Sequence, residues 1–217
     1  MARLKVGVLV SGNGSNLQTL IDLCATPGFP AEIALVVSNK PGAGSLDRAA
    51  RAGIPAQVIP HQDFPDRLAF DQAIDASLRA AGVEFICLAG FLRVLSETFV
   101  EQWHDKIINI HPSLLPNFKG LHTHAQALAA GVRFHGCTVH IVRPLLDDGP
   151  ILVQAAVPVL PEDDEQSLAA RVLKAEHQAY PLALRLIAEG RVRIKGNRAL
   201  IDGAAPDPAT MLMNPRD

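Results

Sequence analysis

The sequence predicts an α/β fold: a single doubly wound, mostly parallel sheet flanked by helices, with antiparallel strands in the C-terminal half. Three observations carry this prediction. Strand-like and helix-like segments alternate through the first half of the chain. The strand-like runs are apolar throughout, as expected for strands that are covered on both faces. The second half changes to two long β patterns joined by the loop Arg143–Pro150, and these patterns look antiparallel.

The elements of the first half follow from these apolar runs and the segments between them. The expected strands are Leu4–Val10, Ile33–Val37, Ala56–Ile59, Glu84–Ala89 and Lys106–Ile110. The expected helices are Ser15–Ala25, Ser45–Ala52 and Asp66–Ala81. In the last of these, Leu68, Ile74 and Leu78 lie on or near one side, which is typical of an amphipathic helix. The β-α-β alternation makes the sheet doubly wound.

The second half is expected to contain further strands and one long helix. The strands are Phe134–Val142, Ile151–Val157, Val192–Ile194 and Ala199–Ile201, the last two forming a hairpin. Glu165–Ala188 is a helix that Pro181 should kink or break, because proline has no amide hydrogen to donate. Without a repeat or an internal linker, residues 1–202 are expected to form one domain. Residues 203–217, rich in Ala, Pro and Asp, are expected to be a loose tail.

Composition and charge exclude several classes of protein. A chain of 217 residues with 48% apolar residues suits one large domain and is not typical of a disordered protein. The net charge of −2 argues against a nucleic-acid binder, which usually carries a basic excess. No apolar run approaches the roughly 20 residues that a membrane span requires, and no cleavage site follows the N-terminus. Cys24, Cys87 and Cys137 show no CxxC spacing and indicate buried thiols of a reducing cytoplasm.

A glycine-rich loop, Ser11-Gly-Asn-Gly-Ser-Asn16, follows the first strand and leads into the first helix. Free amides at a helix N-terminus attract phosphate, and glycines let the backbone approach it. The alternative is that Ser15 and Asn16 only cap the helix. A single phosphate fits this loop better than a dinucleotide does. Leu17 replaces the third glycine of the dinucleotide fingerprint, and Ser38-Asn39 offers no acid to hold a ribose hydroxyl.

Asn109 and His111 close a strand in the run Asn109-Ile-His-Pro-Ser-Leu-Leu-Pro116. Residues two apart in a strand point the same way, so the amide and the imidazole project together from the carboxyl end of the sheet. Such an amide can donate a hydrogen bond to a developing oxyanion, and a histidine can donate a proton or stabilise the same charge. The alternative is a pair of turn-forming residues. His122 and His124 have no acidic or cysteine ligand nearby in sequence, so no metal site is expected.

Asp147 lies in the acidic loop Leu145-Leu-Asp-Asp-Gly-Pro150, between the two antiparallel strands. Asp-Gly-Pro alone is a turn signature. The functional interpretation is that Asp147 reaches His111, because a carboxylate beside an imidazole favours the cationic ring. Spacing along the chain does not decide between the two.

Together these motifs resemble the phosphoribosylglycinamide formyltransferase (GAR transformylase) family of folate-dependent formyltransferases. The resemblance extends from about residue 3 to residue 202, and the order and spacing of its motifs follow the family. The matching segments are Ser11–Asn16, Ala89-Gly-Phe-Leu-Arg93, Asn109–Pro116, His140, Asp147–Pro150, Glu176-His177 and Tyr180-Pro181.

The resemblance implies a cytoplasmic enzyme of de novo purine biosynthesis whose catalytic domain spans residues 1–202. It would move the formyl group of 10-formyltetrahydrofolate to the amine of glycinamide ribonucleotide by direct attack. Asn109 and protonated His111 would stabilise the oxyanion, while Asp147 would keep His111 charged and help to relay the proton. The expected partners are small molecules, without a metal, nucleic acid or membrane, and the chain would be a monomer or homodimer.

The resemblance also implies binding roles. Gly14, Ser15 and Asn16 would hold the substrate phosphate. Glu176 would help to bind the same substrate, although it could instead belong to a solvated helix face. The residues that would contact the folate are Arg67, Leu92, Arg93, Val94, Leu95 and Asn109, with Arg67 facing the glutamate-tail carboxylates. Much of the apolar stretch Leu88–Leu95 could instead be core. The loop Arg143–Asp147 would wrap the pterin, and Thr138 and His140 would border the catalytic residues.

Two positions depart from the family pattern. Asp148 stands where relatives more often have a small or neutral residue, and its extra charge could act on His111 or make no contact. Leu173 stands where relatives often place a polar substrate contact, and the neighbouring Lys174 could compensate.

Three alternatives remain open. A methionyl-tRNA formyltransferase would carry a further C-terminal domain and a basic surface for the tRNA phosphates. A formyltetrahydrofolate deformylase normally has an additional N-terminal regulatory domain, whereas this chain begins at the first strand of the sheet. An idle nucleotide-binding module would keep the phosphate loop but would not require Asn109, His111 and Asp147 together.

Overall fold

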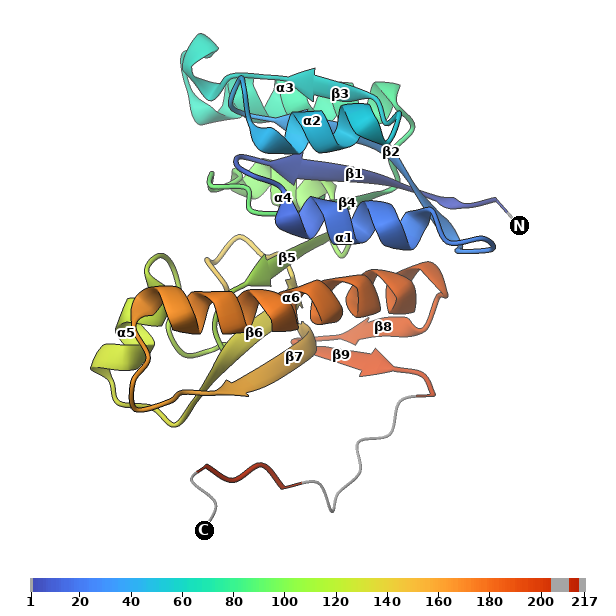
Figure 1. Cartoon of the computed structure of the whole chain (residues 1–217). Coiled ribbons are helices and arrows are strands. Elements are labelled where there is room, and N and C mark those ends of the chain that lie inside the picture. Colours follow the sequence, from blue (N-terminus) through green and yellow to red (C-terminus); the bar gives the residue numbers. More distant parts are fainter. Residues whose placement is uncertain (1, 204–210, 215–217) are drawn as a thin grey trace.

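The computed structural model describes residues 2–203 and 211–214, and its main feature is one seven-stranded sheet (Figure 1). The strands are β1 (Leu4–Val10), β2 (Ala31–Ser38), β3 (Ala56–Val58), β4 (Phe85–Leu88), β5 (Ile107–His111), β6 (Phe134–Ile141) and β7 (Ile151–Pro158). A separate hairpin consists of β8 (Val192–Lys195) and β9 (Arg198–Ile201). The helices are α1 (Ser15–Cys24), α2 (Gly44–Arg51), α3 (Arg67–Ala80), α4 (Glu97–Gln102), α5 (Thr123–Ala129) and α6 (Glu165–Ala188).

The strand order is β3-β2-β1-β4-β5-β6-β7. The first five of these strands are parallel, whereas β6 runs antiparallel to β5 and β7 antiparallel to β6. The predicted fold class is therefore confirmed, including the change to antiparallel strands in the second half. Because β1, β4 and β5 are parallel, their carboxyl ends meet along one edge of the sheet.

Helices cover both faces of the sheet and enclose two hydrophobic cores. One core lies beneath α1 and α6, and the other lies beneath α3 and α4 (Figure 1). Consecutive residues of β1 contribute to opposite cores, with Val8 and Val10 on the α6 side and Leu9 on the α3 side. All three are fully buried. This two-sided burial explains why the strand segments are apolar throughout.

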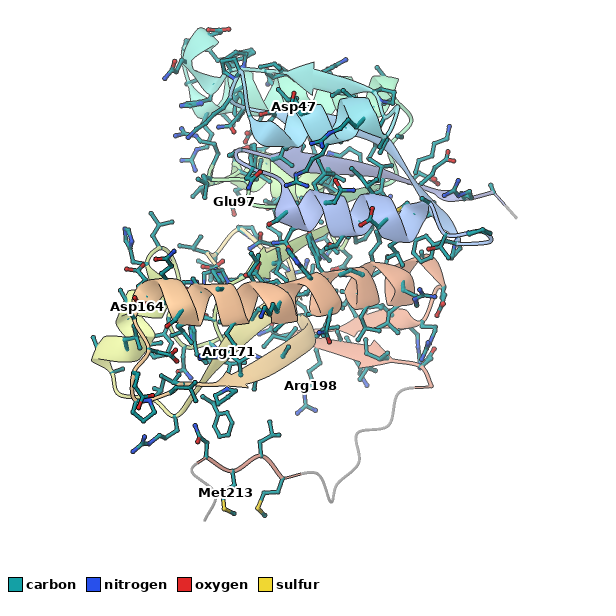
Figure 2. The ribbon with its side chains drawn as sticks, in the orientation of Figure 1. Asp47, Glu97, Asp164, Arg171, Arg198 and Met213 are labelled. Carbon is teal, nitrogen blue, oxygen red and sulfur yellow. The ribbon has the colours of Figure 1, made fainter. Side chains whose placement is uncertain are left out.

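Helix α6 continues through Pro181, so the predicted interruption of this helix is wrong. Tyr180, Ala183 and Leu184 are fully buried around the proline and hold both halves of the helix against the sheet. The Tyr180 hydroxyl also donates to the Leu88 carbonyl at 2.9 Å. Tertiary packing here outweighs the local cost of the missing amide. At the other end, Asp164 caps the helix by accepting from the Ser167 amide (Figure 2).

Several other local expectations were wrong or incomplete. Leu68 is 51% exposed, and the buried face of α3 consists of Phe70, Asp71, Ile74 and Leu78. The short helices α4 and α5 were not predicted, because each is too short to show an apolar period. None of the described helices is long and apolar enough to cross a membrane.

The expected loose tail falls largely outside the described residues. Of the part that is described, Met213 lies on a short segment below β7 (Figure 2). In that segment, Asn214 donates to the Arg133 carbonyl at 2.8 Å.

Gly136 tests the tight pairing of β6 with β7. A Cβ at this position would lie 1.9 Å from the Ala155 carbonyl oxygen, so Gly136→Ala must separate two backbones. We expect a loss of about 3 kcal/mol in the free energy of unfolding, measured by urea denaturation. Gly131→Asn is the matched control, since Gly131 has φ +64° with open space around it and asparagine tolerates this conformation. Equal stability of the two variants would contradict the tight pairing.

Candidate active site

The pairing of β6 with β5 determines which side chains meet at the end of the sheet. Asn109 pairs with His140, and His111 pairs with Thr138. His111 is 5% exposed and His140 is 2% exposed, so both imidazoles are almost removed from water. The predicted supporting residues therefore lie directly opposite the predicted catalytic ones.

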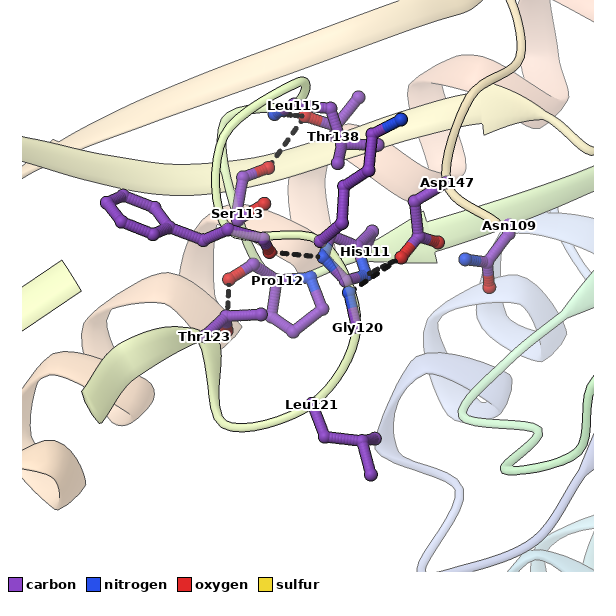
Figure 3. A network of polar contacts seen from close by, with 12 residues as sticks. Asn109, His111, Pro112, Ser113, Leu115, Gly120, Leu121, Thr123, Thr138 and Asp147 are labelled. Carbon is purple, nitrogen blue, oxygen red and sulfur yellow. Dashed lines mark hydrogen bonds and ion pairs between the residues drawn. The ribbon is translucent and has the colours of Figure 1, made fainter. Parts of the chain in front are cut away.

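Asp147 meets His111, as the functional interpretation of the acidic loop required (Figure 3). The distance from His111 Nδ1 to Asp147 Oδ2 is 3.6 Å, with both side chains 7% exposed. The other ring nitrogen, Nε2, lies 2.9 Å from the Phe118 carbonyl and must donate to it, because a carbonyl can only accept. Asp147 Oδ2 also accepts the Gly120 amide at 2.9 Å. Asp147 further lines a pocket of about 490 Å³.

His140 is held as a neutral ring. Its Nδ1 donates to the Ile141 carbonyl at 3.0 Å. Burial lowers the pKa of His140 and outweighs the opposing effects of that hydrogen bond and of Asp147. With Nδ1 protonated and the ring neutral, Nε2 accepts the hydrogen bond from Asn109 Nδ2 at 3.3 Å. His140 therefore orients the Asn109 amide.

Thr138 braces the turn that follows His111. Its hydroxyl donates to the Ser113 carbonyl at 2.7 Å and accepts from the Leu115 amide at 3.0 Å (Figure 3). Thr138 is fully buried. The turn is thus fixed from the neighbouring strand as well as by its two prolines.

Three consecutive residues of the loop after this turn contact the site. Phe118 accepts from His111, Gly120 donates to Asp147, and between them Lys119 Nζ lies 2.5 Å from Asp148 Oδ1. Asp148, whose charge had no predicted partner, is therefore in an ion pair. Sequence analysis missed Phe118 and Gly120 because both act through main-chain atoms, which leave no signal in residue type.

The glycine-rich loop leads into α1 without a side-chain cap. Gly14 is the N-cap residue, in a left-handed conformation with φ 77°, and the described residues provide no side-chain cap for this helix. The alternative that Ser15 and Asn16 only cap the helix is therefore wrong. Asn16 Nδ2 instead donates to Glu176 Oε2 at 2.8 Å. Glu176 is 7% exposed and not part of a solvated helix face, and burial raises the pKa of its carboxyl.

Part of the predicted folate set lies around one pocket of about 380 Å³. The pocket is lined by Arg67, Leu68, Val94, Leu95, Ser96, Glu97, Pro144 and Leu145. Leu92 and Arg93 lie on the same loop but outside this lining, and the Leu92 amide donates to Ser11 Oγ at 2.8 Å. Leu92 and Val94 are 64% and 55% exposed, so the core interpretation of Leu88–Leu95 does not hold for them.

His124 packs against His135, whereas His122 is exposed. His135 Nε2 lies 3.2 Å from His124 Nδ1, and His135 is fully buried. Across residues 2–203 and 211–214, no three histidine, cysteine, aspartate or glutamate side chains gather closely enough to hold a metal ion. Cys24, Cys87 and Cys137 are all buried and free.

Comparison with known proteins identifies a family over most of the chain. The profile described as formyl transferase matches residues 4–184. A phosphoribosylglycinamide formyltransferase of Haemophilus influenzae is 45% identical over 93% of this chain and 95% of its own length. A trifunctional purine biosynthetic protein adenosine-3 of Drosophila pseudoobscura pseudoobscura is 56% identical over 88% of this chain, which spans only 14% of that protein.

A solved structure agrees with the sequence comparison. The crystal structure of glycinamide ribonucleotide transformylase 1 from Symbiobacterium toebii superposes with a TM-score of 0.90 and 46% identity. The match covers 92% of this chain and 94% of that one. The seven-stranded sheet and its antiparallel end are thus shared with an experimentally determined fold.

The buried His135 ring makes stability depend on pH. Burial, with a smaller effect from His124, lowers the pKa of His135 to about 4 from its ordinary 6.5. Below pH 6.5, His135 is protonated in the unfolded chain but stays neutral in the folded protein. The free energy of unfolding should therefore fall as the pH drops from 6.5 towards 4.

Urea titrations between pH 7 and 4.5 test this dependence. His135→Gln should reduce the fall by on the order of 1–3 kcal/mol, since each pKa unit corresponds to about 1.4 kcal/mol. His104→Gln is the control, because the His104 side chain is 63% exposed, and it should behave as the wild type does. Equal falls in all three proteins would contradict the assignment to His135.

Proposed function

The chain belongs to the formyl transferase family, and from that premise we propose that it transfers the formyl group of 10-formyltetrahydrofolate to the amine of glycinamide ribonucleotide. The reaction is a step of de novo purine biosynthesis. The observation that supports this best is the convergence of Asn109, His111 and Asp147 at one end of the sheet. An idle binding module would have no need to bury and orient these three side chains together.

The proposal extends to the setting of the reaction. Residues 1–202 form the catalytic domain, and both substrates are small molecules. 10-Formyltetrahydrofolate is a co-substrate, and the chemistry needs no metal. Three buried free thiols suit a reducing cytoplasm. The enzyme works there as a monomer or homodimer.

The first chemical step is attack of the substrate amine on the formyl carbon. A carbon–nitrogen bond forms, and the formyl oxygen becomes an oxyanion. Asn109 Nδ2 carries two hydrogens, one directed at His140 Nε2 and the second available to the oxyanion. His111 supplies the second donor through Nδ1. At 3.6 Å its contact with Asp147 is longer than a direct hydrogen bond, so the Nδ1 hydrogen is available to the oxyanion.

The second step returns the proton and releases the product. The attacking nitrogen loses a proton, which Asp147 accepts directly or through water. Asp147 then passes this proton, directly or through water, to the folate nitrogen. The oxyanion re-forms the carbonyl as the bond between the folate nitrogen and the formyl carbon breaks, which yields the formamide and tetrahydrofolate. The negative charge of Asp147 also stabilises the cationic His111 ring. The Gly120 amide keeps that carboxylate in place.

Substrate binding uses the two flanking features of the site. The free amides of Gly14, Ser15 and Asn16 hold the phosphate at the start of α1. Glu176 Oε2 accepts a hydrogen bond from Asn16, and we propose that Oε1 accepts hydrogen bonds from hydroxyl groups of the ribonucleotide. On the folate side, Arg67 in its pocket faces the carboxylates of the glutamate tail.

The decisive experiment mixes purified protein with 10-formyltetrahydrofolate and follows release of tetrahydrofolate by absorbance. Release that requires glycinamide ribonucleotide is the expected result. Release of tetrahydrofolate without the ribonucleotide would show that the protein is a deformylase and not a transferase. Folate binding without release under either condition would favour the idle module.

Loss of one oxyanion donor should cost about 10²–10³ in kcat. We therefore expect Asn109→Ala and His111→Ala to fold but to be nearly inactive in the same assay, with circular dichroism as the check on folding. His104→Ala is the matched control, because this histidine is exposed and should keep full turnover. Retention of most turnover by either active-site variant would remove that residue from the mechanism.

A further inference from the structure

Arg48 holds the glycine-rich loop with two hydrogen bonds and the following helix α1 with a third. The residue belongs to α2, and its side chain crosses to the loop. Nε donates to the Asn13 carbonyl at 2.8 Å, and the terminal NH2 group donates to Asn13 Oδ1 at 3.3 Å. The third bond joins the terminal NH1 group to Gln18 Oε1 at 3.3 Å. The guanidinium therefore spans the loop and the second turn of α1.

All three acceptors of Arg48 are neutral. Of the ion pairs within residues 2–203 and 211–214, none includes Arg48. The nearest carboxylate in this network is Asp22, which bonds to the far side of the Gln18 amide at 2.9 Å. After burial, the charge of Arg48 is the second cause that lowers the pKa of His177 on α6. The positive charge is thus present at the loop and is not neutralised by an acid.

The first turn of α2 shapes the same loop. The Ser45 amide donates to the Gly12 carbonyl at 3.1 Å. A Cβ on Gly14 would lie 2.7 Å from Ser45 Cβ, so only glycine allows the two backbones to approach this closely. Ser45 is fully buried against the loop, and its hydroxyl has no hydrogen-bond partner among the described residues. The phosphate loop therefore depends on α2 as well as on α1, which it precedes.

We propose that Arg48 is a positioning residue that determines specificity for a phosphorylated acceptor. It holds Asn13, so that the amides of Gly14, Ser15 and Asn16 converge, and it provides the positive charge that a phosphate dianion requires nearby. This inference rests on the proposed function, because it refines how that acceptor is recognised. A guanidinium held by neutral acceptors can still attract an anionic ligand strongly. In an ion pair, the carboxylate would cancel most of that attraction.

The test compares two acceptors that differ only in the phosphate: glycinamide ribonucleotide and the unphosphorylated glycinamide riboside. The measured quantity is the ratio of kcat/KM for the first over the second. We expect Arg48→Met to lower this ratio by about 30-fold, mainly through KM for the ribonucleotide. KM for 10-formyltetrahydrofolate should stay within about twofold. Arg48→Lys, which keeps the charge but not the planar fork, should recover part of the loss.

Arg51→Met is the matched control, because Arg51 lies on the same helix and, within the part of the chain that the structure describes, its side chain bonds only to the Asp47 carbonyl. It should leave the ratio unchanged. A general loss of fold in Arg48→Met would reduce activity on both acceptors alike and would not change the ratio. An unchanged ratio in both Arg48 variants would overturn the proposal.

Binding of inorganic phosphate, measured by calorimetry, separates this proposal from the proposed function. If the wild type released no tetrahydrofolate with any acceptor, the proposed formyl transfer would be wrong. Phosphate binding that is weaker in Arg48→Met than in the wild type would still support the role of Arg48. Phosphate binding of equal strength in the wild type and in Arg48→Met would overturn it.

Discussion

The antiparallel register of β6 against β5 is the constraint on which the rest of the site depends. It gives Asn109 and His111 a partner each, His140 and Thr138, from one neighbouring strand. A slip of one residue would turn both partners to the opposite face of the sheet. The close approach of β7 at Gly136 belongs to the same constraint, since it leaves no space for any other residue type there. Strand pairing thus acts as a rigid scaffold that fixes the positions of the side chains proposed to be catalytic.

Contacts of helix α6 connect these strands to the glycine-rich loop. Helix α6 carries Glu176 to the phosphate loop and, one turn later, Tyr180 to the ends of β4 and β5. The Tyr180 hydroxyl lies 2.9 Å from the Leu88 carbonyl and 3.4 Å from that of Ile108, next to Asn109. A single helix therefore connects the glycine-rich loop, where we propose that phosphate binds, to the strand that carries Asn109. Continuity of the helix through Pro181 matters for this reason.

Sequence reasoning found the elements with a long apolar period and the side chains that carry chemistry. The change from a parallel to an antiparallel sheet could be predicted from the β-α-β alternation of the first half and the paired β patterns of the second. Asn109, His111 and Asp147 were candidates by residue type, and the family resemblance selected them. The rest depends on contacts between distant segments. The proline rule failed at Pro181 because Ala183 and Leu184 are fully buried beyond it. Arg48 showed no pattern of its own, since its acceptors are a backbone carbonyl and two amide side chains.

The loop over His111 acts through the Phe118 carbonyl and the Gly120 amide, and every residue has a carbonyl. What this loop must preserve is therefore its backbone path, in which Phe118 has φ 54°. A left-handed residue other than glycine costs roughly 1–2 kcal/mol. The Phe118 ring packs edge-on against the buried His135 ring, so replacement by glycine would relieve the backbone but remove this anchor. The loop therefore holds the site through main-chain atoms, while one aromatic ring holds the loop.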